Sequence, residues 1–92
     1  MITGFRHRGL QLFFEEGDHR GINPNHRNRI GRILDVLDFA ETISDVDVPG
    51  FRLHPLRGDM EGFWSVRVSG NWRGIFCFGD AEASEVDLVD YH

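Results

Sequence analysis

Residues 62–78 most constrain what this chain can fold into, because their pattern predicts a β-hairpin. Apolar residues share one parity in each arm: Trp64, Val66 and Val68, then Trp72, Phe76 and Phe78. A period of two buries one face of a strand and leaves the other face free. Between the arms, residues 69–71 are Ser-Gly-Asn, which suits a tight reversal. We therefore expect this hairpin at the centre of a sheet, with both tryptophans in the core.

The second face of the hairpin is polar and basic, and it is where we expect function. It carries Ser65, Arg67 and Arg73. Cys77 has the same parity, but no base lies beside it in the sequence. A thiol needs such a neighbour to become the reactive thiolate at neutral pH, so we do not expect Cys77 to act as a nucleophile.

Patterns elsewhere in the chain predict an α+β domain. The expected elements are a first strand over 1–5, a helix over 9–16 ended by Gly17, a long helix from Asn23-Pro24, an acidic loop over 41–49, a strand over 51–54 and a last strand over 84–89. The long helix carries one apolar stripe, formed by Ile30, Ile33, Leu34 and Leu37. Since the helices precede most of the strands, we expect two N-terminal helices packed on one face of a mostly antiparallel sheet.

Length and composition limit the class of protein. A chain of 92 residues has room for one hydrophobic core, so we expect a single domain over 1–92. No segment approaches the roughly 20 apolar residues of a membrane span, and no secretion signal is visible. The single cysteine, Cys77, cannot form an internal disulfide, which agrees with a reducing compartment. We therefore expect a soluble, cytoplasmic protein with no membrane partner.

Basic and acidic residues are separated along the chain, although the net charge is −5. All ten basic residues are arginines and lie at or before Arg73. A local basic surface can attract phosphate even on an acidic molecule. Exclusive use of arginine suits bidentate phosphate contacts, and it equally suits a GC-rich genome. We expect a solvated basic surface from Arg6, Arg8, Arg20, Arg27, Arg29 and Arg32, and surface positions for His7, His19 and His26.

Titratable side chains gather near the expected strand ends. They are His54, Arg57, Asp90, Tyr91 and His92, with Arg73 on the polar face of the hairpin. If these groups meet on that face, they suit phosphodiester cleavage through a ribose 2′-hydroxyl, with one histidine or carboxylate as base and another group as acid. Arg73 and Arg57 would stabilise the transition state, and Tyr91 would stack on an exposed base. This chemistry needs no cofactor and no metal.

Two other interpretations of the same residues stay open at this point. A metal site formed by His54, Asp90 and His92 is chemically possible, although strand ends give no fixed ligand spacing. Alternatively, His54 beside a proline is a structural residue, and His92 is a solvated chain end.

Four segments, in order along the chain, resemble the HigB family of toxins. They are PGFRLHPLRG at 49–58, GFWSV at 62–66, GNWR at 70–73 and VDYH at 89–92. The opening residues 2–14 and the long helix also fit. HigB toxins belong to the RelE/ParE superfamily and are described as plasmid maintenance system killers. The resemblance covers nearly the whole chain, and it implies a RelE-like fold.

The resemblance implies a type II toxin–antitoxin module whose toxin is a ribosome-dependent mRNA endonuclease acting in the A site. The implied partners are the ribosome, its mRNA and a HigA-like helix-turn-helix antitoxin, through which the complex would reach operator DNA. By position, His54 and His92 receive proton-transfer or substrate-positioning roles, and Asp90, Tyr91 and Arg73 match their partners. Arg57 stands where a lysine is common in the family, so we expect it to bind phosphate rather than donate a proton.

Two rival functions follow from the same superfamily and from the charge pattern. ParE-like relatives poison DNA gyrase without cutting RNA, and a toxin can act mainly as a co-repressor that lies on operator DNA with its antitoxin. His54 and the terminal residues 90–92 favour the nuclease, because a gyrase poison has no need of paired imidazoles. The acidic net charge is the main departure, since toxins that enter the ribosome are usually basic.

Overall fold

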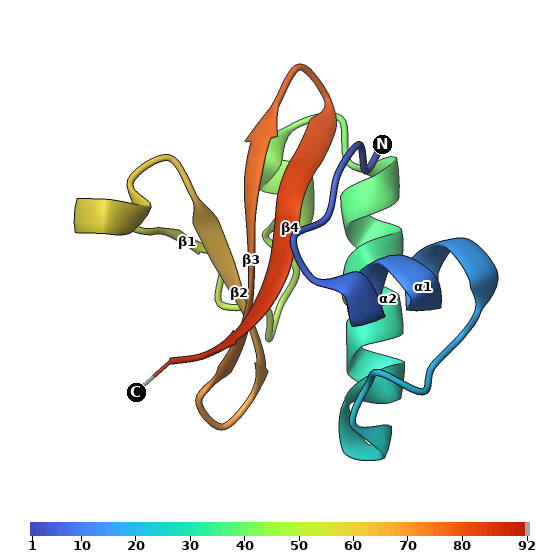
Figure 1. The fold of residues 1–92 in the computed structure, drawn as a ribbon. Coiled ribbons are helices and arrows are strands. Elements are labelled where there is room, and N and C mark those ends of the chain that lie inside the picture. Colours follow the sequence, from blue (N-terminus) through green and yellow to red (C-terminus); the bar gives the residue numbers. More distant parts are fainter. Residues whose placement is uncertain (92) are drawn as a thin grey trace.

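The computed structural model describes residues 1–91, which form two α-helices and a four-stranded antiparallel sheet (Figure 1). The elements in chain order are α1 (Arg8–Glu16), the 3₁₀ helix η1 (Pro24–His26), α2 (Arg27–Phe39), η2 (Ile43–Val46), β1 (His54–Pro55), η3 (Gly58–Met60), β2 (Trp64–Ser69), β3 (Trp72–Gly79) and β4 (Glu82–Asp90). The strands are ordered β1-β2-β3-β4 across the sheet. Helix α2 runs along one side of the sheet, and α1 lies across α2 (Figure 1). The predicted α+β class is confirmed.

The helical segment starts at the predicted Asn23 cap and packs as predicted, but its first turn is the 3₁₀ helix η1, and the long α-helix itself begins only at Arg27. The side chain of Asn23 accepts a hydrogen bond from the backbone N–H of Asn25, and Pro24 opens the first turn. The stripe residues, Ile30, Ile33, Leu34 and Leu37, are all buried against the sheet side of the core. Since most of the stability of a short helix comes from burying such a stripe, this packing explains why α2 forms.

Helix α1 is capped at both ends, and one cap differs from the expectation. Gly17 ends the helix with a left-handed φ of 70°, as predicted. At the other end, Nδ1 of His7 accepts a hydrogen bond from the N–H of Leu10 at 3.1 Å. The prediction that His7 is a plain surface residue is therefore wrong, because its ring satisfies a backbone donor that the first turn leaves unpaired.

The central hairpin forms as predicted, with a two-residue turn at Gly70 and Asn71. Trp72 departs from the prediction: its side chain is 37% exposed rather than in the core. It is the first residue after the turn. Its indole ring and the imidazole ring of His26 form a T-shaped pair with 6.0 Å between ring centroids. His26 is buried, so the prediction that it lies on the surface is also wrong.

The N-terminal segment does not form the predicted strand over 1–5. It runs beside β4 and makes two isolated parallel bridges, Ile2 to Ala83 and Phe5 to Val86. Between these bridges, Glu85 has a left-handed φ of 55°, and the register of β4 against β3 shifts at the same place. This bulge interrupts the ladder that a continuous edge strand would need.

The predicted strand over 51–54 is also wrong, since β1 contains only His54 and Pro55. Phe51 is completely buried in the core, and its carbonyl accepts the N–H of Arg67 at 2.7 Å. Arg52 then takes a left-handed φ of 53°, which an extended strand does not permit. The apolar alternation of this segment therefore reflects one anchored aromatic residue rather than a pleated strand.

Arg29 has a structural role instead of the predicted solvated one. Its guanidinium donates to the carbonyl of Gly50 at 2.6 Å and, through two nitrogens, to the carbonyl of Arg67 at 3.0 and 3.1 Å. It also lies over the ring of Phe51, 5.0 Å from the centroid. One side chain of α2 thus joins the loop before β1 to the end of β2.

Replacing Arg29 with alanine should lower the free energy of unfolding by about 1–3 kcal/mol, because two backbone carbonyls then lack their charged hydrogen-bond donor. Urea denaturation would measure the change. Arg8→Ala removes an exposed arginine from the first residue of α1 and should cost less than about 0.5 kcal/mol. Equal losses of stability in the two variants would contradict the role given to Arg29.

Candidate functional site

The register of the sheet decides which side chains share the face turned away from α2. His54, Ser65 and Ile75 are paired in one row across β1, β2 and β3. Arg67 and Arg73 form the next row on the same face. We call the face that carries these five residues the open face. The prediction that Ser65, Arg67 and Arg73 share one face of the hairpin is confirmed, while Ile75 gives that face a buried apolar floor.

His54 projects from the open face with one edge of its ring held by the protein. Its Nδ1 atom lies 3.4 Å from the carbonyl oxygen of Arg52 and 3.4 Å from Oγ of Ser65. Ser65 is only 2% exposed, whereas His54 itself is exposed. The ring is therefore anchored at Nδ1 and accessible elsewhere, which leaves Nε2 available to a ligand.

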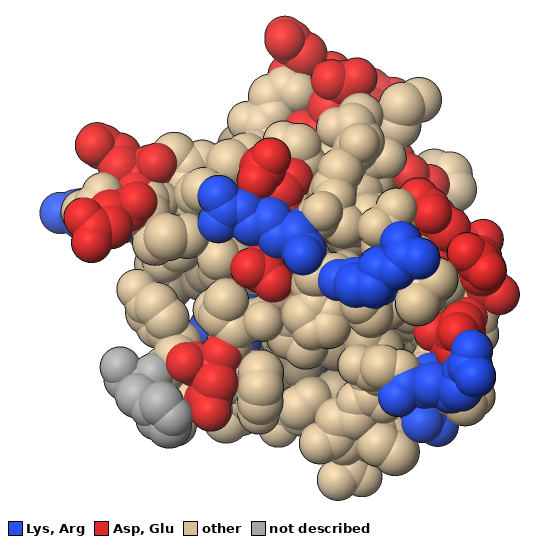
Figure 2. Space-filling view, in the orientation of Figure 1, with Lys and Arg blue, Asp and Glu red and all other residues tan. Residues whose placement is uncertain are grey.

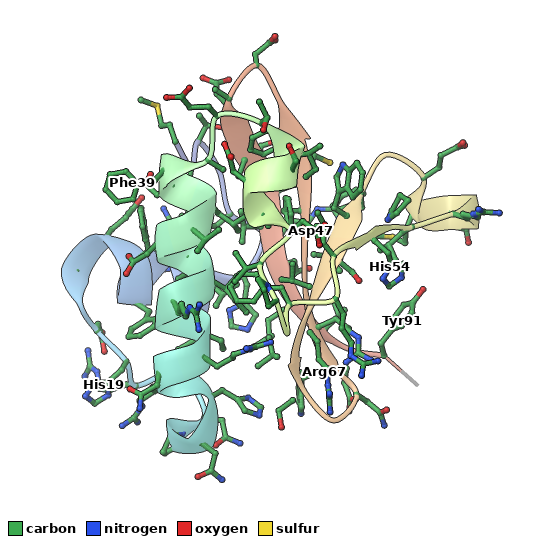
Figure 3. The ribbon with its side chains drawn as sticks, turned by 180° about the vertical axis from the view of Figure 1, so that it is seen from behind. His19, Phe39, Asp47, His54, Arg67 and Tyr91 are labelled. Atoms are coloured by element: carbon green, nitrogen blue, oxygen red, sulfur yellow. The ribbon has the colours of Figure 1, made fainter. Side chains whose placement is uncertain are left out.

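Tyr91 comes to the same side of the molecule from the end of the chain. Its backbone N–H donates to the carbonyl of Asn71 at 2.7 Å, which ties the chain after β4 to the turn of the hairpin. Its side chain is 50% exposed. Figure 3 shows the phenol pointing from the end of β4 toward the side on which His54 projects. A histidine and a phenol from segments far apart in the sequence thus project on the same side of the molecule.

Arg67 and Arg73 lie directly opposite each other on the open face. Like charges in such a cross-strand pair destabilise a sheet, and an anion between them would relieve the repulsion. Nη1 of Arg73 donates to the carbonyls of Gly70 and Trp72 at 2.7 and 3.1 Å, so its guanidinium rests against the turn. From the strand spacing and rise, the Cα atoms of Arg73 and His54 are roughly 12 Å apart. That distance leaves room for a substrate between them.

Two other predicted site residues, Asp90 and Arg57, are not gathered on this face. Asp90 pairs with Trp72 while its neighbour Val89 pairs with Arg73, so alternation directs Asp90 to the other face of the sheet. Arg57 is exposed and precedes η3, beyond the end of β1. His92 lies outside the described residues. Among residues 1–91, no group of three or more His, Cys, Asp or Glu side chains is placed to hold a metal ion.

The thiol of Cys77 is held in its protonated form. Burial, with a smaller contribution from the nearby Glu85 carboxylate, raises the pKa of Cys77. Arg6 opposes this shift, but its guanidinium is engaged in an ion pair with Glu85 at 2.7 Å. A raised pKa means less thiolate at any given pH, which agrees with the expectation that Cys77 is not a nucleophile.

Native protein should therefore react slowly with a disulfide reagent such as DTNB at pH 7, and the rate should rise as the pH passes above the ordinary pKa of a thiol, about 8.5. The same reaction in urea should be fast, because unfolding exposes the thiol. A folded-state rate at pH 7 that matches free glutathione would contradict the raised pKa.

Acidic and basic side chains are separated along the sequence, but they lie beside one another on the surface. Figure 2 shows arginines in separate groups with acidic side chains beside them on the face that it displays. Two of the predicted surface arginines, Arg6 and Arg20, pair with Glu85 and Asp18 at 2.7 and 2.8 Å. These pairs reduce the basic surface that the N-terminal segment offers to a phosphate backbone.

A hollow of about 190 Å³ between α1 and α2 is a poor candidate for the chemistry. It is lined by Phe13, Phe14, Gly31, Leu34 and Asp35. Asp35 is the only titratable side chain in this lining, so no acid–base pair is available there. The open face, by contrast, carries the histidine and the arginines.

Within residues 1–91, no helix has both the length and the apolar content that crossing a membrane would require.

Two helices packed on one face of an antiparallel sheet form the fold of the RelE-like toxins. A chain in the solved YoeB–YefM complex from Staphylococcus aureus superimposes with a TM-score of 0.59 at 15% sequence identity, covering 100% of this chain and 95% of that one. At this identity the likeness concerns the fold alone.

The sequence places the chain within that class. The family model described as "RelE-like toxin of type II toxin-antitoxin system HigB" matches residues 3–92. The chain is 40% identical over 92 residues to Endoribonuclease HigB of Proteus vulgaris, with 100% of both chains covered. It is 35% identical over 85 residues to Toxin HigB-1 of Vibrio cholerae, with 90% of both covered. The chain therefore belongs to the HigB-like toxin family, as its resemblance predicted.

Two groups in the site are absent from the predicted site residues. The pattern of the hairpin marks Ser65 only as part of a polar face, and the carbonyl of Arg52 gives no signal at all. Their contacts with His54 depend on the pairing of β1 with β2 and on the left-handed φ of Arg52. A serine on the polar parity, in a strand expected to neighbour that of His54, is the only signal that the sequence offers.

Proposed function

We propose that this toxin is a ribosome-dependent endoribonuclease that cleaves mRNA in the A site by acid–base chemistry without a metal. The observation that carries the proposal is the open face, where an accessible imidazole shares a surface with paired arginines and a phenol projects toward the same side. The prediction of an endoribonuclease is confirmed at the level of the family and of the 40% identical relative with that name. The dependence on the ribosome and the individual roles below are our proposal.

In the proposed reaction, one of the imidazoles of His54 and His92 removes the proton from a ribose 2′-hydroxyl. The freed electron pair of O2′ forms a bond to phosphorus, and the bond from phosphorus to O5′ breaks. The other imidazole gives its proton to the leaving O5′, so that a 2′,3′-cyclic phosphate and a 5′-hydroxyl result. Positioned acids and bases of this kind each contribute about 10²–10⁴-fold to a rate.

The arginines supply the charge that the transition state needs. Arg73 is the predicted phosphate ligand that lies on the open face, and Arg67 lies directly across from it. A phosphate between them would gain bidentate contacts and remove the like-charge repulsion. Arg57 would add a contact from the loop beyond β1. Asp90 lies on the other face, so we propose it as a partner of its neighbour His92 and not as a group that contacts the ribose.

The exposure of the open face explains why the ribosome would be required. His54 and Arg67 are exposed to solvent, and side chains exposed on a sheet surface hold a flexible mRNA weakly. The decoding centre would present the mRNA in a fixed path, and Tyr91 would stack on one unpaired base. The proximity that most nucleases build into a cleft would here come from the partner.

Family membership also supports the proposed partners and location. A type II module implies an antitoxin, which we propose to be a HigA-like helix-turn-helix protein that brings the complex to operator DNA. The single free thiol, Cys77, agrees with a cytoplasmic site of action.

His54→Ala should lower cleavage of ribosome-bound mRNA by at least about 100-fold, as measured by primer extension in EDTA-free buffer. The matched control is His19→Ala, because His19 is exposed and lies at the far side of the molecule (Figure 3). It should cleave like the unmodified protein. Growth arrest by His54→Ala together with intact mRNA would favour the gyrase alternative, and loss of operator binding alone would favour the co-repressor alternative.

Binding to ribosomes should weaken steeply with salt, because arginines that bind phosphate release counterions. Arg67→Ala should flatten the slope of log K against log salt by about 0.7 for each phosphate that the variant no longer binds, as measured by co-sedimentation. Arg20→Ala is the control, since Arg20 is paired with Asp18, and its slope should not change. An unchanged slope in Arg67→Ala would remove Arg67 from the docking surface.

A further inference from the structure

We infer that the backbone carbonyl of Arg52 holds His54 in the tautomer with its proton on Nδ1, while Ser65 fixes the orientation of the ring, so that Nε2 is the basic nitrogen of the site. The inference rests on the proposed catalytic role of His54 and goes beyond it by assigning His54 as the base. The family resemblance assigns no role to Ser65 or to Arg52.

The first support is the placement of Ser65. Its Cα is the register partner of the Cα of His54 in the pairing of β1 with β2. Its Oγ lies 3.4 Å from Nδ1, and the side chain is 2% exposed. A buried hydroxyl needs a hydrogen-bond partner, and the partner that the structure gives it is the ring of His54. Because Ser65 belongs to a central strand rather than a loop, its position is firmly held.

The second support is the backbone at Arg52. This residue has a φ of 53°, in the left-handed region that residues other than glycine rarely adopt. The strain reverses the chain between the buried Phe51 and strand β1, and it brings the carbonyl of Arg52 to 3.4 Å from Nδ1 of His54. Strain of this kind persists where the surrounding structure requires it, and it is frequent at functional sites.

The chemistry of the two oxygens decides the tautomer. A carbonyl can only accept a hydrogen bond, so it stabilises a ring that carries its proton on Nδ1 and repels one that has a lone pair there. The hydroxyl of Ser65 can accept from the same N–H. The same hydroxyl could equally donate to an unprotonated Nδ1, so the carbonyl of Arg52 is the contact that favours the Nδ1–H form. The lone pair of the neutral ring then lies on Nε2, at the opposite edge from the sheet.

This tautomer gives His54 a defined task in the proposed reaction. The proton of the ribose 2′-hydroxyl moves to Nε2 while O2′ bonds to phosphorus, and the leaving O5′ is protonated by another group. The imidazolium that forms keeps its Nδ1–H bond to the carbonyl of Arg52. An Nε2–H tautomer would instead offer a proton to the 2′-hydroxyl and would have no base to remove one.

The test is long-range ¹H–¹⁵N NMR of the free toxin at a pH where its histidines are neutral, with the His54 signals assigned by comparison with His54→Gln. We expect the shift of a protonated nitrogen at Nδ1 and of an unprotonated nitrogen at Nε2. Ser65→Ala should keep the Nδ1–H tautomer, which the carbonyl of Arg52 fixes, but loosen the ring and reduce kcat for ribosome-bound mRNA by about 10–100-fold, with KM nearly unchanged. Ser65→Thr, which keeps the hydroxyl, should recover most of the rate.

The control is Ser69→Ala, the same change at an exposed position of the same strand, which should alter neither the spectrum nor kcat. A proton on Nε2 in the unmodified protein would overturn the inference, as would a Ser65→Ala variant with an unchanged kcat. The spectrum does not depend on nuclease activity. A protein with the Nδ1–H tautomer that cleaves no mRNA would therefore overturn the proposed function and leave the positioning of His54 intact.

Discussion

In the pairing of β2 with β3, Val66 lies opposite Gly74 and Trp64 opposite Phe76, and the rest of the structure depends on this register. It sends Val66 and Phe76 into the core beneath α2 and leaves Ser65 on the open face. A slip of one residue would exchange the two faces and put the site into the core. Gly74 belongs to this constraint, because a Cβ there would approach Cγ2 of Val66 to 3.3 Å.

The arginines of this acidic chain divide into groups with different physical roles. Arg29 joins α2 to two backbone carbonyls and covers an aromatic ring of the core. Arg6 and Arg20 are engaged in ion pairs at the surface. Arg67 and Arg73 face each other on the open face, where a bound phosphate would offset their repulsion. The number of arginines and their positions in the sequence do not reveal which arginine has which role. Each role depends on the oxygen atoms that the fold brings near the guanidinium.

Prediction from the sequence succeeded where the signal was local and failed where distant segments compete. The hairpin, the stripe of α2 and the cap at Gly17 all have short-range patterns, and all are present. The segment before β1 also alternates, but the core captures Phe51 completely and the chain turns at Arg52. The first five residues carry a strand-like pattern, and a bulge at the neighbouring edge leaves them only two bridges.

The sequence by itself determined the central hairpin, the helical layer, the HigB-like family and the candidate residues, because periodicity and motif spacing are properties of short segments. Only the tertiary structure decided how those residues meet. Strand pairing places Ser65 beside His54, tethers Tyr91 to the hairpin turn and directs Asp90 to the opposite face. The reason is that the register between strands distant in the chain is set by packing against α2, and no local pattern records it.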